Sequence, residues 1–454
     1  MSKKPADLIY GRDDKPPILV AIILGIQHIF TMSSTLMLPV IIVQEINGSF
    51  LQIQSIVCFS MIGIGIGTVL QCLRKGPIGS GYLCPHLCSP SYLPVSIQAA
   101  WLGGLPLLHG MIIFSGIFEA IFSRIVHKLK RLFPTEVSGL VVLMVGISLI
   151  PIGASKFVGI ELAGDPIRPK HLLIASLTLM TMIGINIWSK GKIRLYCVII
   201  GMAVGYLLSF LGGVLAVADL KHILEAAFFA VPGVGVERFK WSFSWSLLIP
   251  FMIVTLCGSL KSVGNITTCQ KINDDDWKEP DMKNIGKGLL AEAIGIFSAG
   301  LLGGTATDTS SSNIGLSAAT GATSRRIGII AGIIFICLAF LPKLTAIVSI
   351  MPPPVMGAIL IFVTSFVIIA GFQILLTRPF TTRMAFVVGL SFIFGTSLEI
   401  LPGLYSHVHP WLRPIFSSSL TFATILAIVL NQIFNIGEKP APWCPRESST
   451  DEHR

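Results

Sequence analysis

The sequence is dominated by apolar runs of about 20 residues, each long enough to cross the roughly 30 Å hydrocarbon core of a bilayer as a helix. Only 12% of the 454 residues are charged, against about 25% in a soluble globular chain, and the mean hydropathy is +0.79. These values exclude a disordered chain and an ordinary soluble enzyme. Because the apolar residues form runs and do not alternate with polar ones, they predict an all-α polytopic membrane protein and not a β-barrel.

Fourteen segments are candidates for membrane crossings. Two of them, residues 88–103 and 311–322, are too short to span as helices. The stretch 218–245 is less hydrophobic, and we expect it to form an interfacial linker. The segments are residues 17–43, 51–73, 88–103, 105–126, 136–154, 171–189, 195–217, 246–267, 287–303, 311–322, 326–350, 354–377, 383–401 and 416–436.

The basic residues divide unevenly between the two sides that fourteen crossings create. Of the 33 lysines and arginines, 24 lie on the side of the N-terminus, 7 lie on the other side, and Lys261 and Lys343 lie within segments. Since cytoplasmic loops carry the excess of positive charge, both termini are expected in the cytoplasm and the protein in the plasma membrane, the inner membrane of a bacterium. The net charge of +10 is thus explained by topology, and no nucleic-acid partner is predicted.

The two short segments contain breaks rich in glycine, proline and serine, at residues 79–90 and 303–313. They are the third and tenth segments, which correspond in two halves of seven. Matched interruptions indicate an inverted-repeat transporter with its site where the broken elements meet, because lipid cannot satisfy exposed backbone N–H and C=O groups. The alternative is a pair of ordinary loops, which would leave only twelve spans.

Several motifs resemble the nucleobase–ascorbate transporters, also called nucleobase:cation symporters of the second type. Residues 312–321 match the family signature (Gln, Glu or Pro, then Asn-x-Gly, four residues, Thr, and Arg, Lys or Gly) at every position except the first, Ser312. Within it, Gly315 and Thr320 are expected beside the site. The other similar motifs, in the family's order, are Gln27-His28, Ser34-Thr35 with Pro39, the stretch 259–267, Ser324-Arg325 and the stretch 352–358.

The resemblance implies two inverted seven-segment repeats, with segments 3 and 10 each built from a short strand and a half helix. It implies a core domain of segments 1–4 and 8–11 that moves like an elevator against a gate domain of segments 5–7 and 12–14. Family members carry uracil, xanthine, urate and other purines, usually with a proton, or ascorbate with sodium, and many are dimers. The ranges are an N-terminal tail 1–16, core 17–126, gate 127–217, linker 218–245, core 246–350, gate 351–436 and a C-terminal tail 437–454.

The chain departs from this family at the residues that would contact the substrate. The glutamate of segment 8 that hydrogen-bonds the base is Lys261 here, the head of the signature is Ser312, and the later His or Asp of segment 8 is Asn265. Acceptors for the N–H groups of a base are lost and a cation is gained. Lys261 precedes the loop residue Lys271 by ten positions, about 15 Å along a helix, and so lies near mid-membrane.

Three explanations compete for a lysine at that depth, where an unpaired charge is costly. It binds an anionic substrate, such as urate, the xanthine anion or a base bearing a carboxylate. It pairs with Asp308 or Glu292, the acids of the neighbouring segments 9 and 10. In the third explanation, Lys261 has lost its proton through burial or extends its side chain to the cytoplasmic interface. The first two are compatible if the substrate displaces the acid.

The remaining candidates surround the breaks. Asn313 can cap a half helix whose exposed N–H groups hold a polar or anionic ligand, and Gly315 permits close packing or the close approach of a ligand. His28 matches the family's histidine beside the site, or is a structural hydrogen-bonding residue. His86 and Leu87 of the first break are expected to contact the substrate; the His86 side chain donates to a ligand or is satisfied by backbone.

These features predict a secondary transporter of nucleobases, purines such as xanthine or urate in anionic form. The alternative is a transporter or exchanger of small inorganic or carboxylate anions with sulfate-permease-like architecture. No enzyme activity, cofactor or metal site is expected, because Cys84, His86 and Cys88 lack a further Cys/His pair and a nucleotide-binding motif is absent. The expected partners are a small-molecule substrate, H⁺ or Na⁺ as coupling ion, the lipid bilayer and a second copy of the chain.

Overall fold

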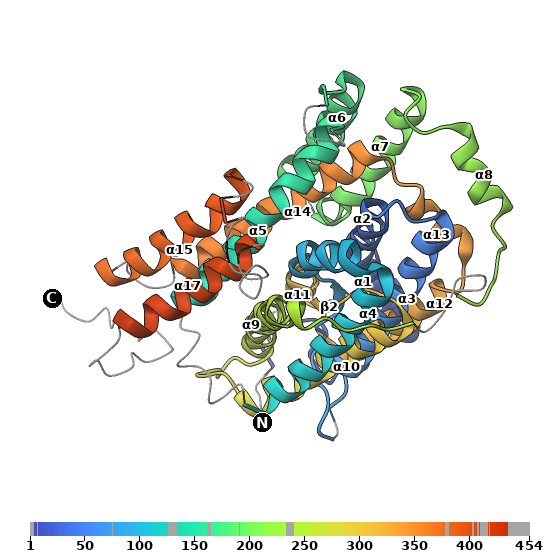
Figure 1. Cartoon of the computed structure of the whole chain (residues 1–454). Coiled ribbons are helices and arrows are strands. Elements are labelled where there is room, and N and C mark those ends of the chain that lie inside the picture. The colour runs from blue at the N-terminus through green and yellow to red at the C-terminus, as the bar shows by residue number, and fades with distance from the viewer. Residues whose placement is uncertain are drawn as a thin grey trace.

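The protein is represented by a computed structural model (Figure 1). In the described part of the chain the regular secondary structure is helical apart from two strands of three residues each. It comprises all residues except 1–3, 7, 75, 126–134, 161–164, 190, 233–239, 377–380, 402–403, 406–407, 409–415, 417 and 435–454. The predicted C-terminal tail therefore lies outside the described residues.

The chain forms its elements in the order that the colours of Figure 1 follow. The first half contains α1 (Ile18–Ser33), α2 (Met37–Glu45), α3 (Phe50–Gln71), β1 (His86–Cys88), η1 (Pro90–Tyr92), α4 (Leu93–Ile125), α5 (Thr135–Val158), α6 (Pro169–Trp188), η3 (Gly191–Tyr196) and α7 (Cys197–Leu211). The second half contains α8 (Val217–Glu225), η4 (Trp245–Leu247), α9 (Leu248–Ile272), α10 (Met282–Leu302), β2 (Thr307–Thr309), α11 (Ser311–Thr320), α12 (Arg325–Leu338), α13 (Pro342–Ser349), α14 (Pro353–Leu375), α15 (Thr382–Ile400) and α17 (Ser419–Phe434).

Each of the fourteen predicted segments contains a described helix. Among the described residues, nine helical stretches are long and apolar enough to cross a membrane, with α1 and α2 counted together. The pair α12 and α13, bent by 83°, makes a tenth, while α7 and α17 are shorter apolar helices. The all-α polytopic membrane fold is confirmed, and the number of crossings stays a prediction.

The third and fourth predicted segments form the kinked helix α4. The kink lies at Gly103 and Gly104, between the two predicted segments, and Pro106 follows it. Gly104 has φ = +67°, a backbone conformation that residues with a Cβ rarely adopt. The first part of α4 is thus a half helix that follows β1, and the second part is a full span.

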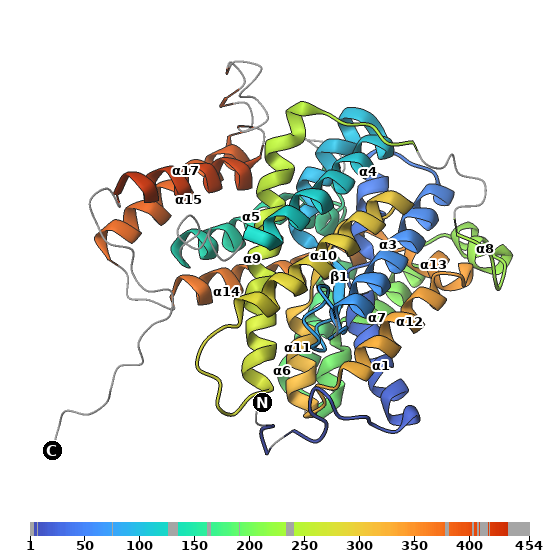
Figure 2. The ribbon, with the colours of Figure 1, turned by 90° about the horizontal axis from the view of Figure 1, so that it is seen from below.

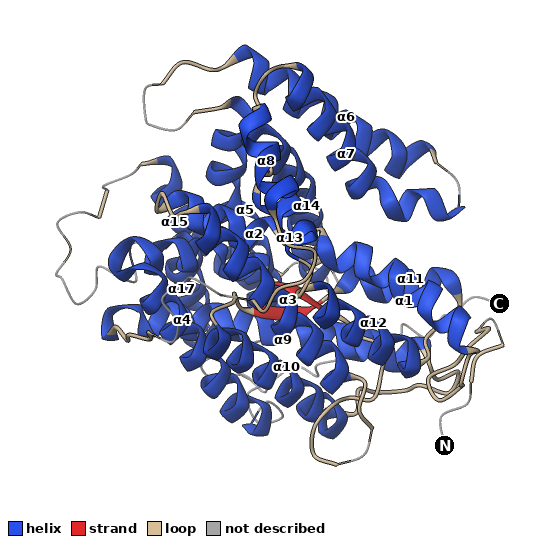
Figure 3. Cartoon of the chain, turned by 90° about the vertical axis from the view of Figure 1, so that its right-hand side faces the viewer, coloured by secondary structure: helices blue, strands red, loops and turns tan. Residues whose placement is uncertain are grey.

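The two breaks meet each other through β1 and β2, which form a two-stranded antiparallel sheet in the interior of the helical structure (Figure 3). The register places Leu87 opposite Asp308. Beyond the strands, the backbone N–H of Ser310 donates to the carbonyl of Pro85 (2.8 Å), and that of Ser89 donates to the carbonyl of Ala306 (3.0 Å). The predicted strand and half helix are therefore present in both halves, and the interpretation of these breaks as ordinary loops is wrong.

Two sets of helices pack chiefly among themselves (Figures 1 and 2). In one set, α5 lies along α14 and contacts α6 and α17, and α15 packs on α17. In the other, α10 packs against α3 and α4, and α12 packs against α3 and α1. Small residues permit close contact, because a Cβ at Gly371 of α14 would lie 2.6 Å from the backbone nitrogen of Leu143 on α5. α9 contacts helices of both sets.

The N-terminal tail before α1 binds the ends of both broken segments. The N–H of Tyr10 donates to the carbonyl of Gly321, just after α11, at 3.0 Å. Arg12 donates to the carbonyl of Gly81 in the first break at 3.0 Å, and its guanidinium lies 4.0 Å from the centre of the Tyr82 ring. The tail thus joins the first half of the chain to the second.

Ion pairs add to this junction. Asp13 accepts from Arg74 at 2.6 Å and from Arg325 at 3.2 Å. Asp14 pairs with Lys4 at 2.6 Å, and the hydrogen bond from Lys4 holds the pKa of Asp14 below its usual range. Because these side chains are largely exposed, each pair contributes little on its own, and the backbone and cation–π contacts carry most of the junction.

The predicted sidedness can be tested at the loop between α9 and α10. We expect a cysteine introduced as Lys278→Cys, in a background with Cys337→Ser and Cys444→Ser, to resist a membrane-impermeant maleimide added to intact cells, because this loop belongs to the basic side. Lys170→Cys, on the opposite side, should be labelled. Labelling of Lys278→Cys from outside would contradict cytoplasmic termini.

Candidate functional site

A lysine and an aspartate meet where α9 passes the strand pair. Lys261 on α9 donates to both carboxylate oxygens of Asp308 on β2, each at 3.0 Å. The hydroxyl of Ser89 donates to Asp308 Oδ2 at 2.7 Å. The Asp308 side chain is fully buried, whereas a quarter of the Lys261 side chain is exposed. Of the two predicted acids, the structure pairs Lys261 with Asp308, so the carboxylate is satisfied, while part of the lysine side chain stays exposed.

Polar side chains of α9 hold the end of β2 in place. Ser262 and Thr309 share a hydrogen bond between their hydroxyls at 2.6 Å. The amide of Asn265 donates to the hydroxyl and carbonyl of Thr309 at 2.9 and 3.1 Å, and its oxygen accepts from Ser311 at 2.8 Å. Asn265, predicted beside the site, therefore positions the junction of β2 and α11.

The half helix α11 begins with a cap that differs from the prediction. Its N-cap is Ser310, whose hydroxyl accepts from the backbone N–H of Asn313 at 3.2 Å. The expectation that Asn313 caps the helix is wrong, because the helix begins at Ser311 and Asn313 is in its first turn. The Asn313 amide instead donates to the Ser310 hydroxyl at 2.9 Å and accepts from His28 Nδ1 at 2.7 Å. Both side chains are buried, so His28 hydrogen-bonds to a candidate site residue, and its role beside the site stays a prediction.

The first break presents a different environment. His86 is fully buried, and its backbone N–H donates to the Thr68 hydroxyl at 3.0 Å. Neither ring nitrogen of His86 has a hydrogen-bond partner among the described residues. Neighbouring Leu87 is 8% exposed. Backbone therefore does not satisfy the His86 ring, which keeps its polar atoms available inside the molecule.

Two buried glutamates lie close to this site. Glu119 on α4 accepts from the Ser259 hydroxyl at 2.7 Å through Oε1, while its Oε2 has no hydrogen-bond partner in the described part of the chain. Neither oxygen of Glu292 on α10 has a hydrogen bond of normal geometry there, although the Ser262 hydroxyl and the charges of Glu119, Asp308 and Lys261 act on this carboxyl. Sequence reasoning named Glu292 but missed Glu119, although an acid inside an apolar segment was an available signal.

One face of the site is open. Ser312 on α11 is exposed, and, apart from the chain neighbours and the backbone of the same helix, no described atom lies within 4 Å of a Cβ built on Gly315 or on Gly264 of α9. Close packing as the reason for Gly315 is therefore wrong, and space for a ligand remains. Thr320, at the end of the signature, donates to the carbonyl of Leu316 at 2.8 Å and belongs to the helix end.

Comparison with known proteins places these features in a family. The model of the permease family Xan_ur_permease matches residues 19–404. Xanthine permease XanP of Escherichia coli K12 is 28% identical over 446 residues, covering 94% of this chain and 95% of XanP. Uric acid permease PucJ of Bacillus subtilis 168 is 28% identical over 431 residues, covering 92% and 93%. A putative purine permease of Clostridium perfringens is 26% identical over 428 residues, covering 94% and 93%.

Solved structures share the fold at much lower sequence identity. The transmembrane domain of the cyanobacterium bicarbonate transporter BicA aligns with a TM-score of 0.55 at 13% identity, covering 93% of this chain and all of that domain. The murine Solute Carrier 26 family member A9 anion transporter aligns with a TM-score of 0.62 at 10% identity, covering 93% and 69%. These likenesses concern the fold alone.

The fold and the buried polar centre between two broken segments define a polytopic membrane transporter. The chain belongs to the permease family that its sequence matches from residue 19 to residue 404. This confirms the resemblance drawn from the signature motif, and the relatives are transporters and not enzymes.

The ion pair makes a prediction about stability. Lys261→Met should lower the melting temperature of the purified protein, because it leaves the carboxylate of Asp308 buried without its cation. Breaking a fully buried pair costs about 3–5 kcal/mol, and the partial exposure of Lys261 places the loss near the lower end. Lys261→Met combined with Asp308→Asn should recover most of the loss. Two additive losses would show that the residues do not interact.

Proposed function

We propose that the protein is a secondary transporter of nucleobases, taking purines of the xanthine and urate type in anionic form. The sequence supports this, because the chain matches xanthine permease XanP and uric acid permease PucJ over more than nine-tenths of its length. A carrier of small inorganic or carboxylate anions is the alternative, because BicA and the Solute Carrier 26 protein have the same fold.

The observation that carries the proposal is the partly exposed side chain of Lys261, whose ammonium pairs with the buried carboxylate of Asp308. An anionic purine that enters from the open side accepts hydrogen bonds from Lys261 and competes with Asp308 for its charge. A buried ammonium favours negative charge strongly, since Coulomb energy grows as the local dielectric constant falls. The exposed hydroxyl of Ser312 and the space at Gly315 then face the rest of the purine.

The proposal includes movement of a core (residues 17–126 and 246–350) against a gate (127–217 and 351–436), both termini in the cytoplasm, and a homodimer in the plasma membrane. The separate packing of the α5–α14 and α3–α10 sets supports such a division. Lys156 on α5, in the gate, pairs with Glu45 on α2, in the core, at 2.8 Å.

This pair provides a test of the division. Lys156→Glu or Glu45→Lys alone should change the transport rate, and the double variant, in which the two charges are exchanged, should restore it.

We also propose the proton as the coupling ion, held by Glu292. A fully buried carboxyl without a hydrogen bond in the described structure favours its uncharged form, since an isolated charge there is costly. Glu119 and Asp308 add negative charge around it and Lys261 adds positive charge. A substrate anion that neutralises Lys261 removes the attraction on the Glu292 carboxylate, and proton uptake by Glu292 follows.

A ligand panel tests the substrate class. Purified protein should gain thermal stability with xanthine and urate and not with sulfate, bicarbonate or dicarboxylates, because stabilisation follows occupancy of the folded state. Stabilisation by sulfate or bicarbonate, with none by purines, would instead establish the anion carrier.

Gly315→Ala locates the bound ligand. The added methyl group meets open space in a helix, so stability should be kept or rise by up to about 1 kcal/mol, while purine affinity should fall roughly tenfold, or about 1.4 kcal/mol. Gly389→Ala on α15 is the matched control, since its Cβ position is also free of neighbours within 4 Å. Unchanged affinity in Gly315→Ala would place the ligand elsewhere.

Proton coupling predicts a pH dependence. Uptake should rise as the external pH falls, because protonated Glu292 accompanies the substrate, and substrate addition should alkalinise the medium outside proteoliposomes. Glu292→Gln imitates the uncharged form and should abolish both effects while retaining purine binding. Glu136→Gln, at the start of α5, should behave as wild type. Proton movement that persists in Glu292→Gln would assign coupling to another group.

A further inference from the structure

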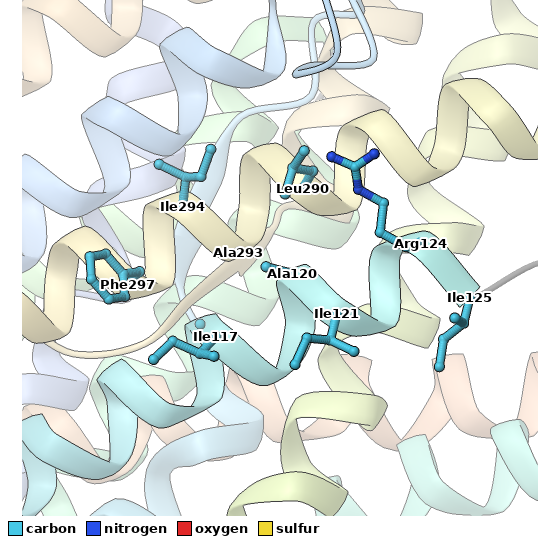
Figure 4. A pocket seen from close by; sticks show the side chains of 10 residues that line it. Ile117, Ala120, Ile121, Arg124, Ile125, Leu290, Ala293, Ile294 and Phe297 are labelled. Atoms are coloured by element: carbon cyan, nitrogen blue, oxygen red, sulfur yellow. The ribbon is translucent and has the colours of Figure 1, made fainter.

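A groove of about 520 Å³ lies between α4 and α10 and contains none of the polar residues described above (Figure 4). Its α4 side is exposed, as Ile117 and Ile121 retain 50% and 59% of their accessible surface. All but one of its lining side chains are apolar or absent. The lining residues are Gly116, Ile117, Ala120, Ile121, Arg124, Ile125, Leu290, Ala293, Ile294 and Phe297.

The shape of the groove follows from small residues at its floor and branched residues at its rims. At Gly116 the helices nearly touch, because a Cβ there would lie 2.6 Å from the backbone nitrogen of Phe297. Ala120 and Ala293 continue the floor, with isoleucines projecting beside them (Figure 4). The α4 residues 117–125 cover about 12 Å of helix axis, most of the roughly 15 Å depth of one leaflet's hydrocarbon layer.

Arg124 is the charged residue of the groove, near the end of α4 (Figure 4). In the described part of the chain it has no hydrogen bond or ion pair. An arginine near the end of a membrane helix extends its guanidinium to the headgroup layer, where anionic lipid attracts it. The sequence that follows adds Lys128, Lys130 and Arg131, so this end of α4 belongs to a strongly basic segment.

We propose that this groove binds an anionic phospholipid, with one acyl chain along the apolar floor and the phosphate group at Arg124. In a bilayer a membrane-facing apolar groove is filled by lipid chains and not by water. The contact with the acyl chain is therefore available to any phospholipid, while the guanidinium of Arg124 selects a net negative headgroup. The site is independent of the proposed substrate and of the Lys261–Asp308 pair.

The test is native mass spectrometry of the full-length protein in detergent, titrated with dioleoyl phosphatidylglycerol and dioleoyl phosphatidylcholine, which have identical chains. Wild type should bind phosphatidylglycerol about fivefold more tightly than phosphatidylcholine. This factor corresponds to about 1 kcal/mol per basic residue near the membrane. Arg124→Gln should remove that preference and keep the affinity for phosphatidylcholine. Ala120→Phe, which fills the groove, should weaken binding of both lipids.

Lys15→Gln provides the control, because it removes one exposed positive charge outside the groove, and it should retain the preference. An equal loss of preference in Lys15→Gln and Arg124→Gln would overturn the proposal in favour of general charge attraction. If Ala120→Phe keeps the native melting temperature and binds lipid as wild type does, no acyl chain lies in the groove. Stabilisation by inorganic phosphate equal to that by phosphatidylglycerol would also overturn it.

Discussion

The rest of the structure depends on the pairing of two short strands at membrane depth. Backbone N–H and C=O groups in the bilayer have no water to bind, so a helix can be interrupted there only where protein supplies partners. β1 and β2 supply them to each other, and the hydroxyls of Thr68 and Thr35 accept from further N–H groups of β1. The same register places the carboxylate of Asp308 beside Lys261, so the element that makes the break possible also builds the site.

The polar centre has an unusual balance of charge. Glu119, Glu292 and Asp308 are buried acids, and Lys261 is the cation that hydrogen-bonds to one of them. If every group were ionised, the acids would exceed the base by two charges in a medium of low dielectric constant, which is strongly unfavourable. The proposed protonation of Glu292 would reduce this excess of negative charge, and it would link proton binding to any ligand that changes the charge at Lys261.

Much of this architecture follows from the sequence, because hydropathy runs and glycine-rich breaks are local signals. The breaks and the pairing of Lys261 with Asp308 or Glu292 could be predicted, since few acids lie in the neighbouring segments. The choice of Asp308 could not, because it depends on strand register. Ser310 as the cap was missed because its role depends on where α11 begins. Glu119 could have been named as an acid inside an apolar segment, but not its partner Ser259, which lies 140 residues away in the chain.

The docked N-terminal tail has a consequence for assembly of the chain in the membrane. Tyr10 and Asp13 are translated some 310 residues before their partners Gly321 and Arg325. At 5–20 residues per second this delay is roughly 15–60 s. The tail can bind Arg74 and Gly81 of the first half before then, but its contacts with Gly321 and Arg325 form only after that interval, when the second broken segment has been made.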